Sequence, residues 1–488
     1  MRKSYLRFMA LLLVLLMSAP LLLGCSDDKK TPSQSGSKQE QSDDGSEKRN
    51  NLPKLNFKDE NFTILARYHN EMVDVEEITG DSVNDAIYNR NRKVEQELGI
   101  TVGCVNFAQE GNELREAILA GEMIYNAVQE DMPTMATYTK EGLFYCDDYI
   151  SYLDLDQPYW TKGVIDSLTV CGKRYMFSGD ISIYENRNLW CIYYNKELAE
   201  NLQLGNLYEF RDNGTWTLDK FLDLASKGAA DLDGNGRWSF RIDQFATINM
   251  QEAYSGMYNA MGQKIIVRDN DGHMVFNADS ESSINVYQRL SDYCAAGYGR
   301  QFLTVDRVQT EDKWGDQYEV FHSGRGLFLH GVASSVESEG LRNMEQEYGM
   351  MPLPKRDETQ REYISSSQEW GYCVYGVPVC TPNMDVSGAA LECLCDYSTD
   401  TIRYACYDQA LYRKYSRDVD ATITLDILFD NTVVDPGFVF IRYNDTPLRN
   451  VLRTGIQANK IASTIEANKR LIVKAIEEYE DAIDNLDH

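Results

Sequence analysis

The run NFTILAR at residues 61–67 is short, apolar and rich in residues favoured in sheets, and it predicts a buried strand. The segment DSVNDAIYNRNRKVEQEL at residues 81–98 places apolar side chains at a near-helical spacing, which predicts a helix. Asp81 is suited to be its N-cap, and Gly99 is suited to end it. A second strand is predicted over ITVGCVNF at residues 100–107.

The same alternation continues along the chain. Residues 113–120 predict a helix that Gly121 ends, and residues 125–129 predict a third strand. Strands and helices that alternate with short loops predict an α/β fold with a mostly parallel sheet covered by helices. Ligands of such sheets bind beyond the carboxyl ends of the strands. Those ends lie at Tyr68, at residues 107–109, and at Glu130, Asp131 and Met132.

The N-terminus has the pattern of an export signal. A basic start is followed at residues 8–23 by an apolar run that is too short to cross a membrane comfortably. The run leads into Gly24 and Cys25, and the sequence LLGC resembles the lipobox of bacterial lipoproteins. This resemblance implies that residues 1–24 are a lipoprotein signal peptide. It also implies that Cys25 carries fatty acyl chains such as palmitate and anchors the protein to the extracytoplasmic face of the cell membrane. The alternative is an ordinary buried cysteine.

Residues 25–55 are predicted to be a disordered tether. Residues 26–51 contain no aromatic or aliphatic side chain, so this segment cannot bury enough apolar surface to offset the entropy of the chain. The rest of the 488 residues is long enough for two or three domains or for one large two-lobed unit. The formal net charge of −28 excludes nucleic-acid binding through a basic face, because such a charge repels phosphate backbones.

Sequence motifs of enzymes are absent. The chain has no G-x-S-x-G, H-E-x-x-H, G-x-x-x-x-G-K-[ST] or G-x-G-x-x-G motif, and none of its cysteines is spaced C-x-x-C. We therefore expect no catalytic residues and no required cofactor. With 76 acidic residues, a pair of glycosidase carboxylates can be neither found nor dismissed from the sequence. The ten cysteines after Cys25 are expected to be buried and reduced.

An acidic loop at residues 231–243 (DLDGNGRWSFRID) matches the opening of a calcium-binding loop, D-x-[DN]-x-[DN]-G. The acid that would close the site comes one residue later than the pattern requires, because Ile242 occupies the twelfth position. The alternative is a turn stabilised by its own side-chain hydrogen bonds. The predicted ligands of a structural calcium ion are Asp231, Asp233, Asn235, Arg237 and Asp243.

Aromatic residues make up 11% of the chain, with 31 tyrosines and six tryptophans among them. Tyrosine and tryptophan offer flat apolar faces with a polar group, which suits carbohydrate binding in a cleft. Most such rings are expected to lie in the core, so only those at predicted loops or strand ends are candidates. They are Tyr68, Tyr184, Trp190, Tyr254, Tyr258 and Trp370.

Several segments resemble, in their order along the chain, the extracellular solute-binding proteins of ABC importers, family 1, which includes the maltose- and oligosaccharide-binding proteins. The resemblance covers the chain from about residue 57 onward. Its landmarks are GKRYMFSGDISI (172–183), LWCIYYNKELAENLQL (189–204), GTWTLDKFLDLASK (214–227), the acidic loop, FHSGRGLFLHG (321–331) and YGMMPLPK (348–355).

This resemblance implies a two-lobed periplasmic-binding-protein-like fold with the ligand held between the lobes. Residues 56–178 and 353–410 would form the first lobe, and residues 179–352 and 411–488 the second. The ligand-binding positions implied are Tyr68, Glu130, Asp131, Asp180, Tyr184, Trp190, a segment near 249–258 that contains Tyr254 and Tyr258, and Trp370.

The function implied is capture of a solute, a mono- or oligosaccharide, for delivery to an ABC permease by a monomeric, lipid-anchored binding protein. Two alternatives stay open: an extracytoplasmic carbohydrate-active enzyme, and a ligand-sensing lipoprotein that has no transporter. The absence of catalytic motifs disfavours the enzyme.

Overall fold

A computed structural model describes residues 49–67, 73–107, 112–249, 253–297, 302–367, 371–407, 418–443 and 446–488. The described residues all belong to one compact unit. Cys25, Tyr68 and Trp370 lie outside the described residues, as does the side chain of Tyr184. Within the described part of the chain, no helix is long and apolar enough to cross a membrane.

The first of two five-stranded sheets contains the alternating elements at the start of the folded chain. Its strands, in spatial order, are β2 (Ile100–Asn106), β1 (Glu60–Ala66), β3 (Ala127–Asp131), β13 (Cys373–Pro378) and β4 (Phe144–Tyr145). Strand β1 is parallel to β2 and β3, whereas β13 is antiparallel to β3 and β4. Helices α2 (Ser82–Leu98) and α13 (Met384–Asp400) share one hydrophobic core with this sheet, and α3 (Glu113–Ala120) and α4 (Met132–Lys140) pack into another.

The predicted starts and ends of these helices are confirmed. The Asp81 carboxylate accepts hydrogen bonds from the backbone N–H groups of Val83 and Asn84 at 3.0 and 3.1 Å, which caps α2. Gly99 ends this helix at a φ of +63°, a left-handed conformation that glycine adopts without a steric penalty. The third strand begins and ends two residues later than predicted, so Glu130 and Asp131 belong to the strand itself.

The second sheet is built from later segments. Its strands, in spatial order, are β11 (Tyr348–Pro352), β5 (Trp190–Asn195), β10 (Gly326–Val332), β6 (Phe245–Ile248) and β9 (Phe302–Leu303). Strands β6, β9 and β10 are parallel, and β5 is antiparallel to both β10 and β11. Helix α8 (Leu218–Ala225) is capped by Thr217 and buries Leu218, Phe221, Leu224 and Ala225.

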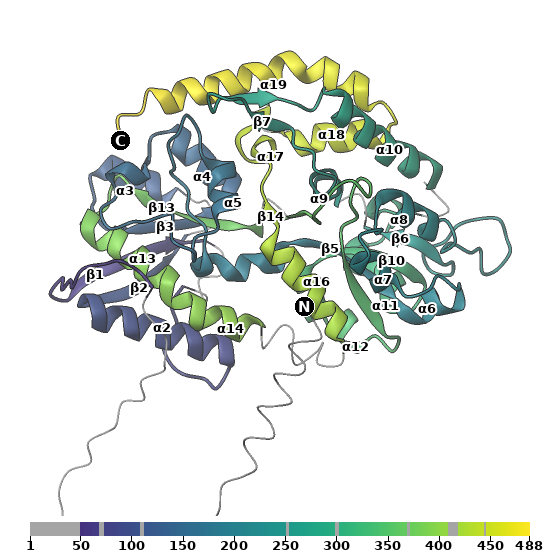
Figure 1. Ribbon diagram of the computed structural model, residues 1–488, viewed down its shortest axis with the longest axis horizontal. Coiled ribbons are helices and arrows are strands. Elements are labelled where there is room, and N and C mark those ends of the chain that lie inside the picture. The colour runs from purple at the N-terminus through teal and green to yellow at the C-terminus, as the bar shows by residue number, and fades with distance from the viewer. Residues whose placement is uncertain are drawn as a thin grey trace, which may run out of the picture. The chain divides into compact units, whose positions relative to one another are not determined.

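Within the part of the chain that the structure describes, three segments lie between the two sheets. The 3-10 helix η3 (Asp180–Asn188) leads into β5, and the chain from Pro352 to Cys373 leads from β11 back to β13. The short strand β12 (Ser365–Ser366) of this return pairs with β14 (Thr432–Val433) of the third segment. Figure 1 shows the two sheets on either side of β14. The predicted two-lobed α/β fold is confirmed.

The C-terminal segment contacts elements beside both sheets. Helix α16 (Val419–Asp430) packs on β11, and α17 (Pro436–Phe440) packs on α4. The long helix α19 (Ile461–Asp484), yellow in Figure 1, contacts α10 (Glu281–Gly297) and α18 (Leu448–Gln457) as well as α4. The Tyr479 hydroxyl donates a hydrogen bond to the carbonyl oxygen of Ala136 at 2.9 Å. The assignment of residues 411–488 to the second lobe therefore stays a prediction.

Candidate ligand-binding site

A cavity of about 350 Å³ lies at one edge of the second sheet. The parallel strands β6 and β10 end at this edge, and the antiparallel strand β5 begins there, with Trp190 opposite Val332. Strand β11 also ends there, where Pro352 pairs with Cys191, so two of the connecting segments leave the sheet from the same edge. The residues that line the cavity are Trp190, Asn249, Trp314, Tyr318, Gly331, Val332 and Ser335.

Two buried polar groups of the cavity lack hydrogen-bond partners among the described residues. They are the indole N–H of Trp190 and the side-chain oxygen of Asn249, and each residue is 3% exposed. The Asn249 amide nitrogen, in contrast, does have partners. It donates hydrogen bonds to the Tyr318 hydroxyl at 2.9 Å and to the carbonyl oxygen of His330 at 3.0 Å. An unpaired buried donor or acceptor costs about 1–3 kcal/mol, so both groups favour a ligand that pairs with them.

Two aromatic rings of helix α11 (Lys313–His322) complete the cavity. Trp314 is 41% exposed, and Tyr318 lies one helical turn further along the same face. None of the seven lining residues is charged at neutral pH. Behind the cavity, burial lowers the pKa of His330 to about 3, so this imidazole is neutral as well. The arrangement suits an uncharged ligand that has hydroxyl groups and an apolar face.

The predicted acidic pair lies at the carboxyl end of β3 in the first sheet. Glu130 forms an ion pair with Arg67, with 3.2 Å between Oε2 and Nη1, and its Oε1 accepts from the Asp131 backbone N–H at 2.9 Å. Burial raises the pKa of both carboxyls, that of Glu130 to about 7. Asp131 accepts from the Thr134 backbone N–H at 2.9 Å and thereby caps α4. Asp131 therefore has a structural role as the cap of α4. Its contact with a ligand stays a prediction.

The other predicted positions are spread over the molecule. Asp180 begins η3 and lies 3.5 Å from Arg403, and burial raises the pKa of its carboxyl. Tyr254 and Tyr258 on helix α9 (Tyr254–Ala260) are buried, and neither lines the cavity. The Tyr254 hydroxyl donates to the Cys294 sulfur, and Tyr258 stacks on Tyr287 with ring centroids 4.1 Å apart. Both rings therefore have interior partners.

Of the predicted aromatic residues, the structure places Trp190 in the cavity. Asn249 stands at the start of the segment predicted near residues 249–258. The sequence analysis missed Trp314 and Tyr318. Their spacing of four residues, which puts two rings on one face of a helix, is the signal that would have found them.

The acidic loop brings three predicted metal ligands together. One carboxylate oxygen from each of Asp231, Asp233 and Asp243 lies within 4.8 Å of the others. Asp243 reaches this position despite its displacement in the motif, because it accepts from the Leu232 and Ser239 backbone N–H groups at 2.9 and 2.7 Å. An all-oxygen set of this kind fits Ca²⁺. The remaining two predicted ligands follow in the same turn, where the Asn235 side-chain oxygen accepts from the Arg237 backbone N–H at 2.7 Å.

Calcium binding stays a prediction and is tested by replacing Asp231 and Asp233 with Ala. At a free Ca²⁺ concentration about 100 times the dissociation constant, the free energy of unfolding of the unaltered protein is expected to rise by about 2.7 kcal/mol. The double variant should show no such rise. A matched control replaces Asp269 and Asp271 of another exposed acidic turn with Ala. Identical calorimetric titrations of the unaltered protein and the Asp231/Asp233 variant would leave only the alternative of a self-stabilised turn.

The ten cysteines after Cys25 all lie within the described residues and form no disulfide there, and most of them are buried. This agrees with the expectation of buried, reduced thiols.

No protein-family model and no curated protein matches the sequence. Solved structures do match the fold. An ABC substrate-binding protein from Listeria monocytogenes in complex with cycloalternan is 13% identical, with a TM-score of 0.52 over 86% of this chain and 99% of that chain. A cyclo/maltodextrin-binding protein complexed with maltotetraose is 13% identical, with a TM-score of 0.54 over 88% of this chain and 99% of that chain.

An ABC transporter solute-binding protein from Thermotoga lettingae, bound to α-D-tagatose, is 15% identical, with a TM-score of 0.51 over 86% of this chain and all of that chain. At such low identity the likeness concerns the fold. The comparisons thus show that this chain has the two-lobed α/β fold of the solute-binding proteins of ABC transporters.

Proposed function

We propose that the protein is the extracytoplasmic substrate-binding component of an ABC importer and that it binds a carbohydrate. The observation that carries this proposal is the uncharged cavity, in which a buried donor on Trp190 and a buried acceptor on Asn249 lie beside two aromatic rings. The similar folds support this proposal, because the solved structures named above contain bound cycloalternan, maltotetraose and α-D-tagatose.

Sugar hydroxyls match the two unpaired groups. A hydroxyl accepts hydrogen bonds through its lone pairs and donates one through its proton, so sugar hydroxyls supply the kinds of partner that the Trp190 donor and the Asn249 acceptor need. The C–H face of a sugar ring can in turn stack on the exposed ring of Trp314.

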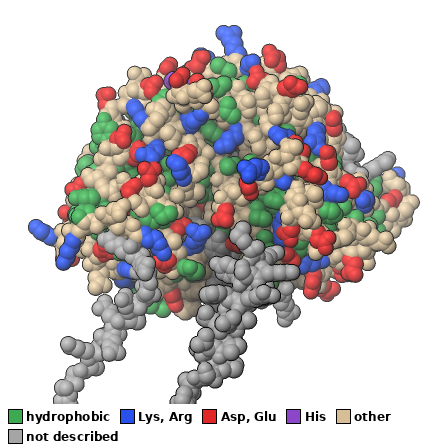
Figure 2. Space-filling view, viewed as in Figure 1, with side chains coloured by type: hydrophobic (Ala, Val, Ile, Leu, Met, Phe, Trp, Pro, Cys, Tyr) green, Lys and Arg blue, Asp and Glu red, His purple; other side chains and the backbone are tan. Residues whose placement is uncertain are grey.

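The charge of the protein favours a neutral ligand. Its net charge of −28 opposes long-range attraction of an anion, and acidic and basic side chains are interspersed over the face shown in Figure 2.

The lipid anchor is part of the same proposal. Its support is the lipobox-like sequence that ends at Cys25, followed by residues 26–51 without aromatic or aliphatic side chains. A protein held to the outer face of the membrane in this way would stay close to its permease, and two or more acyl chains give stable anchoring.

Replacing Trp314 with Ala is expected to weaken carbohydrate binding about tenfold or more. A ring stacked on a sugar removes roughly 50–100 Å² of apolar surface from water, which is worth about 1–2.5 kcal/mol. The melting temperature of the free protein should hardly change, because the ring is 41% exposed. Affinity is measured by calorimetry, with the ligand chosen from a thermal-shift screen of mono- and oligosaccharides, polyols and peptides.

The control variant is Tyr404→Ala, which removes a ring that is 68% exposed on α14 (Ile402–Tyr407) and does not line the cavity. It should bind as tightly as the unaltered protein. A screen in which no carbohydrate stabilises the protein would contradict the proposal, and so would an unchanged affinity of Trp314→Ala. Conversion of the sugar to products during the titration would favour an enzyme instead.

A further inference from the structure

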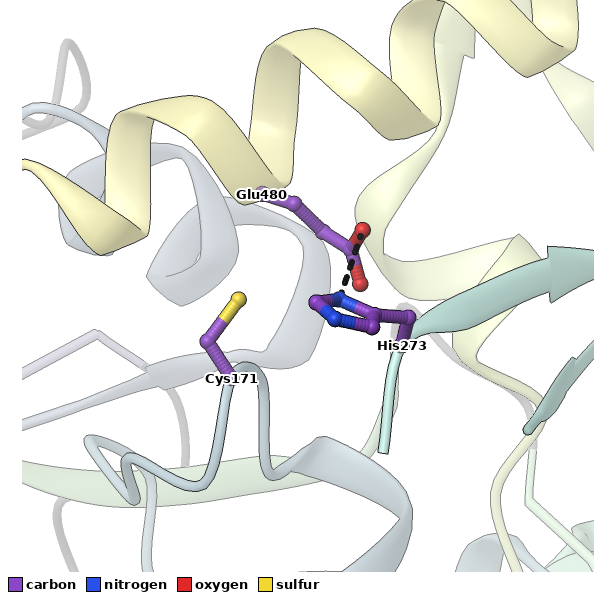
Figure 3. Close-up of side chains that lie close together, drawn as sticks. All are labelled: Cys171, His273 and Glu480. Carbon is purple, nitrogen blue, oxygen red and sulfur yellow. Dashed lines mark ion pairs between the residues drawn. The ribbon is translucent and has the colours of Figure 1, made fainter. Parts of the chain in front are cut away.

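A second group of metal-binding side chains lies away from the cavity. Figure 3 shows Cys171, His273 and Glu480 converging from separate elements. One ligand atom of each residue lies within 4.8 Å of the others. Cys171 belongs to a tight turn, His273 to the loop between β7 (Ile266–Arg268) and β8 (Met274–Phe276), and Glu480 to helix α19. Three segments that are far apart in the sequence thus meet at one point.

The turn that carries Cys171 is held in place by backbone bonds. Val170 and Lys173 exchange N–H···O hydrogen bonds of 3.1 and 2.9 Å, and the two residues between them have φ values of +51° and +75°. Turns with two left-handed residues favour Asn, Asp or Gly at the first of these positions, so the turn itself does not call for cysteine. The Lys173 ammonium donates to the carbonyl oxygens of Ile483 and Leu486, which attaches the turn to the end of α19.

The other two side chains are held by the hairpin. The Asp269 carboxylate accepts from the His273 backbone N–H at 2.9 Å, which shapes the loop. Oε1 of Glu480 accepts from the Met274 backbone N–H at 2.6 Å, and Oε2 lies 3.6 Å from Nδ1 of His273. Such outer contacts fix the orientation of ligands before a metal binds.

A second carboxylate lies close by on the same helix. Asp484 lies one turn after Glu480 on α19, so the two carboxylates project from the same face. Burial, together with the nearby carboxylates of Asp484 and Glu480, raises the pKa of the Cys171 thiol to about 12. The Arg268 guanidinium lies near Cys171 and Glu480. It donates hydrogen bonds to the carbonyl oxygens of Ser167 and Gly272, at 3.2 Å each.

We propose that Cys171, His273 and Glu480 bind one zinc ion, with a water molecule as the fourth ligand. Sulfur, imidazole nitrogen and carboxylate oxygen are the donors that zinc takes in tetrahedral sites, whereas Ca²⁺ and Mg²⁺ prefer oxygen alone. Binding replaces the thiol proton by the metal and releases that proton to solvent. The ion joins the turn, the hairpin and the C-terminal helix, and it takes no part in the ligand cavity.

Cobalt(II) replaces zinc as the spectroscopic probe, because a cobalt–thiolate bond gives a charge-transfer band in the near ultraviolet. The full chain, reduced and free of chelators, is titrated with Co²⁺ and, by calorimetry, with Zn²⁺. One ion of either metal is expected per chain. Cys171→Ser should lose the band, and the matched control Cys104→Ser, which alters a half-buried cysteine of β2, should keep it.

His273→Gln decides the question if Cys171→Ser does not fold. The His273 side chain is 55% exposed, so this variant should fold normally and bind zinc at least tenfold more weakly. The proposal is overturned if the unaltered protein binds no zinc, or if Cys171→Ser retains the band. Unchanged zinc affinity of His273→Gln overturns it as well. The Asp231→Ala/Asp233→Ala variant should keep full zinc affinity, which separates this site from the acidic loop.

Discussion

Replacing Asn249 with Gly is expected to lower carbohydrate affinity about tenfold. The change removes the unpaired side-chain oxygen that is proposed to accept a hydrogen bond from the ligand, and it removes the amide that donates to the Tyr318 hydroxyl. The lost hydrogen bond to the ligand is worth about 0.5–1.5 kcal/mol, and a tenfold loss of affinity corresponds to about 1.4 kcal/mol. Glycine is the right replacement because Asn249 has a φ of +62°, which alanine would adopt only with strain.

The control for this prediction is Asn277→Ala. The Asn277 amide also makes an interior hydrogen bond, to the carbonyl oxygen of Lys264 at 2.9 Å, but it does not line the cavity. Both variants should lose some stability, and only Asn249→Gly should lose affinity in calorimetry at a temperature where both are folded. Equal affinity of the two variants would place the ligand elsewhere.

Three strands of the first sheet, β1, β2 and β3, could be predicted because their signals are local, whereas β13 and β4, which add antiparallel pairings, were not predicted. The Asp81 cap, the glycine that ends α2 and the apolar runs of β1 and β2 each act within a few residues. The bounds of β3 were predicted two residues early. Its position depends on pairing with β1 and β13, which are far away in the sequence, so no local pattern reveals it.

The candidate site was only partly predictable, since its residues come from distant segments. Trp190 was predicted both as an aromatic residue at a strand end and through the resemblance to solute-binding proteins, and it lines the cavity. Trp314 and Tyr318 approach it only because β10 pairs with β5 on one side and with β6 on the other. Tyr258 was predicted to contact ligand, but the structure gives it a stacking partner, Tyr287, and aromatic content alone does not separate these two environments.

The acidic loop shows the limit of matching a motif by position. Asp243 falls one residue after the position that the calcium pattern assigns to the closing acid. In the structure its backbone N–H donates to the Ser239 carbonyl oxygen at 2.9 Å, and this turn carries the carboxylate back to Asp231 and Asp233. The displacement of Asp243 by one residue in the sequence therefore does not keep its carboxylate away from those of Asp231 and Asp233.

Replacing Trp216 with Ala is expected to lower the free energy of unfolding by about 3–5 kcal/mol, the range for removal of a large buried ring. The Trp216 side chain is fully buried, and its ring lies 5.9 Å from that of Phe221 and 6.2 Å from that of Phe328. Its indole N–H donates to the carbonyl oxygen of Pro352 at 2.8 Å. Because β11 ends at Pro352, this bond fixes the point from which the chain leaves the second sheet toward the first. Urea unfolding measures the change.

Two further variants separate packing from the hydrogen bond. Trp216→Phe keeps an apolar ring but leaves the Pro352 carbonyl unpaired, so we expect a loss of about 1–3 kcal/mol. Trp238→Ala removes a half-buried indole that contacts Phe245, and it should cost less than Trp216→Ala because part of that ring already faces water. If Trp216→Ala costs no more than Trp238→Ala, the ring does not hold the core of the second sheet. If Trp216→Phe is neutral, the bond to Pro352 does not hold the start of the connecting segment.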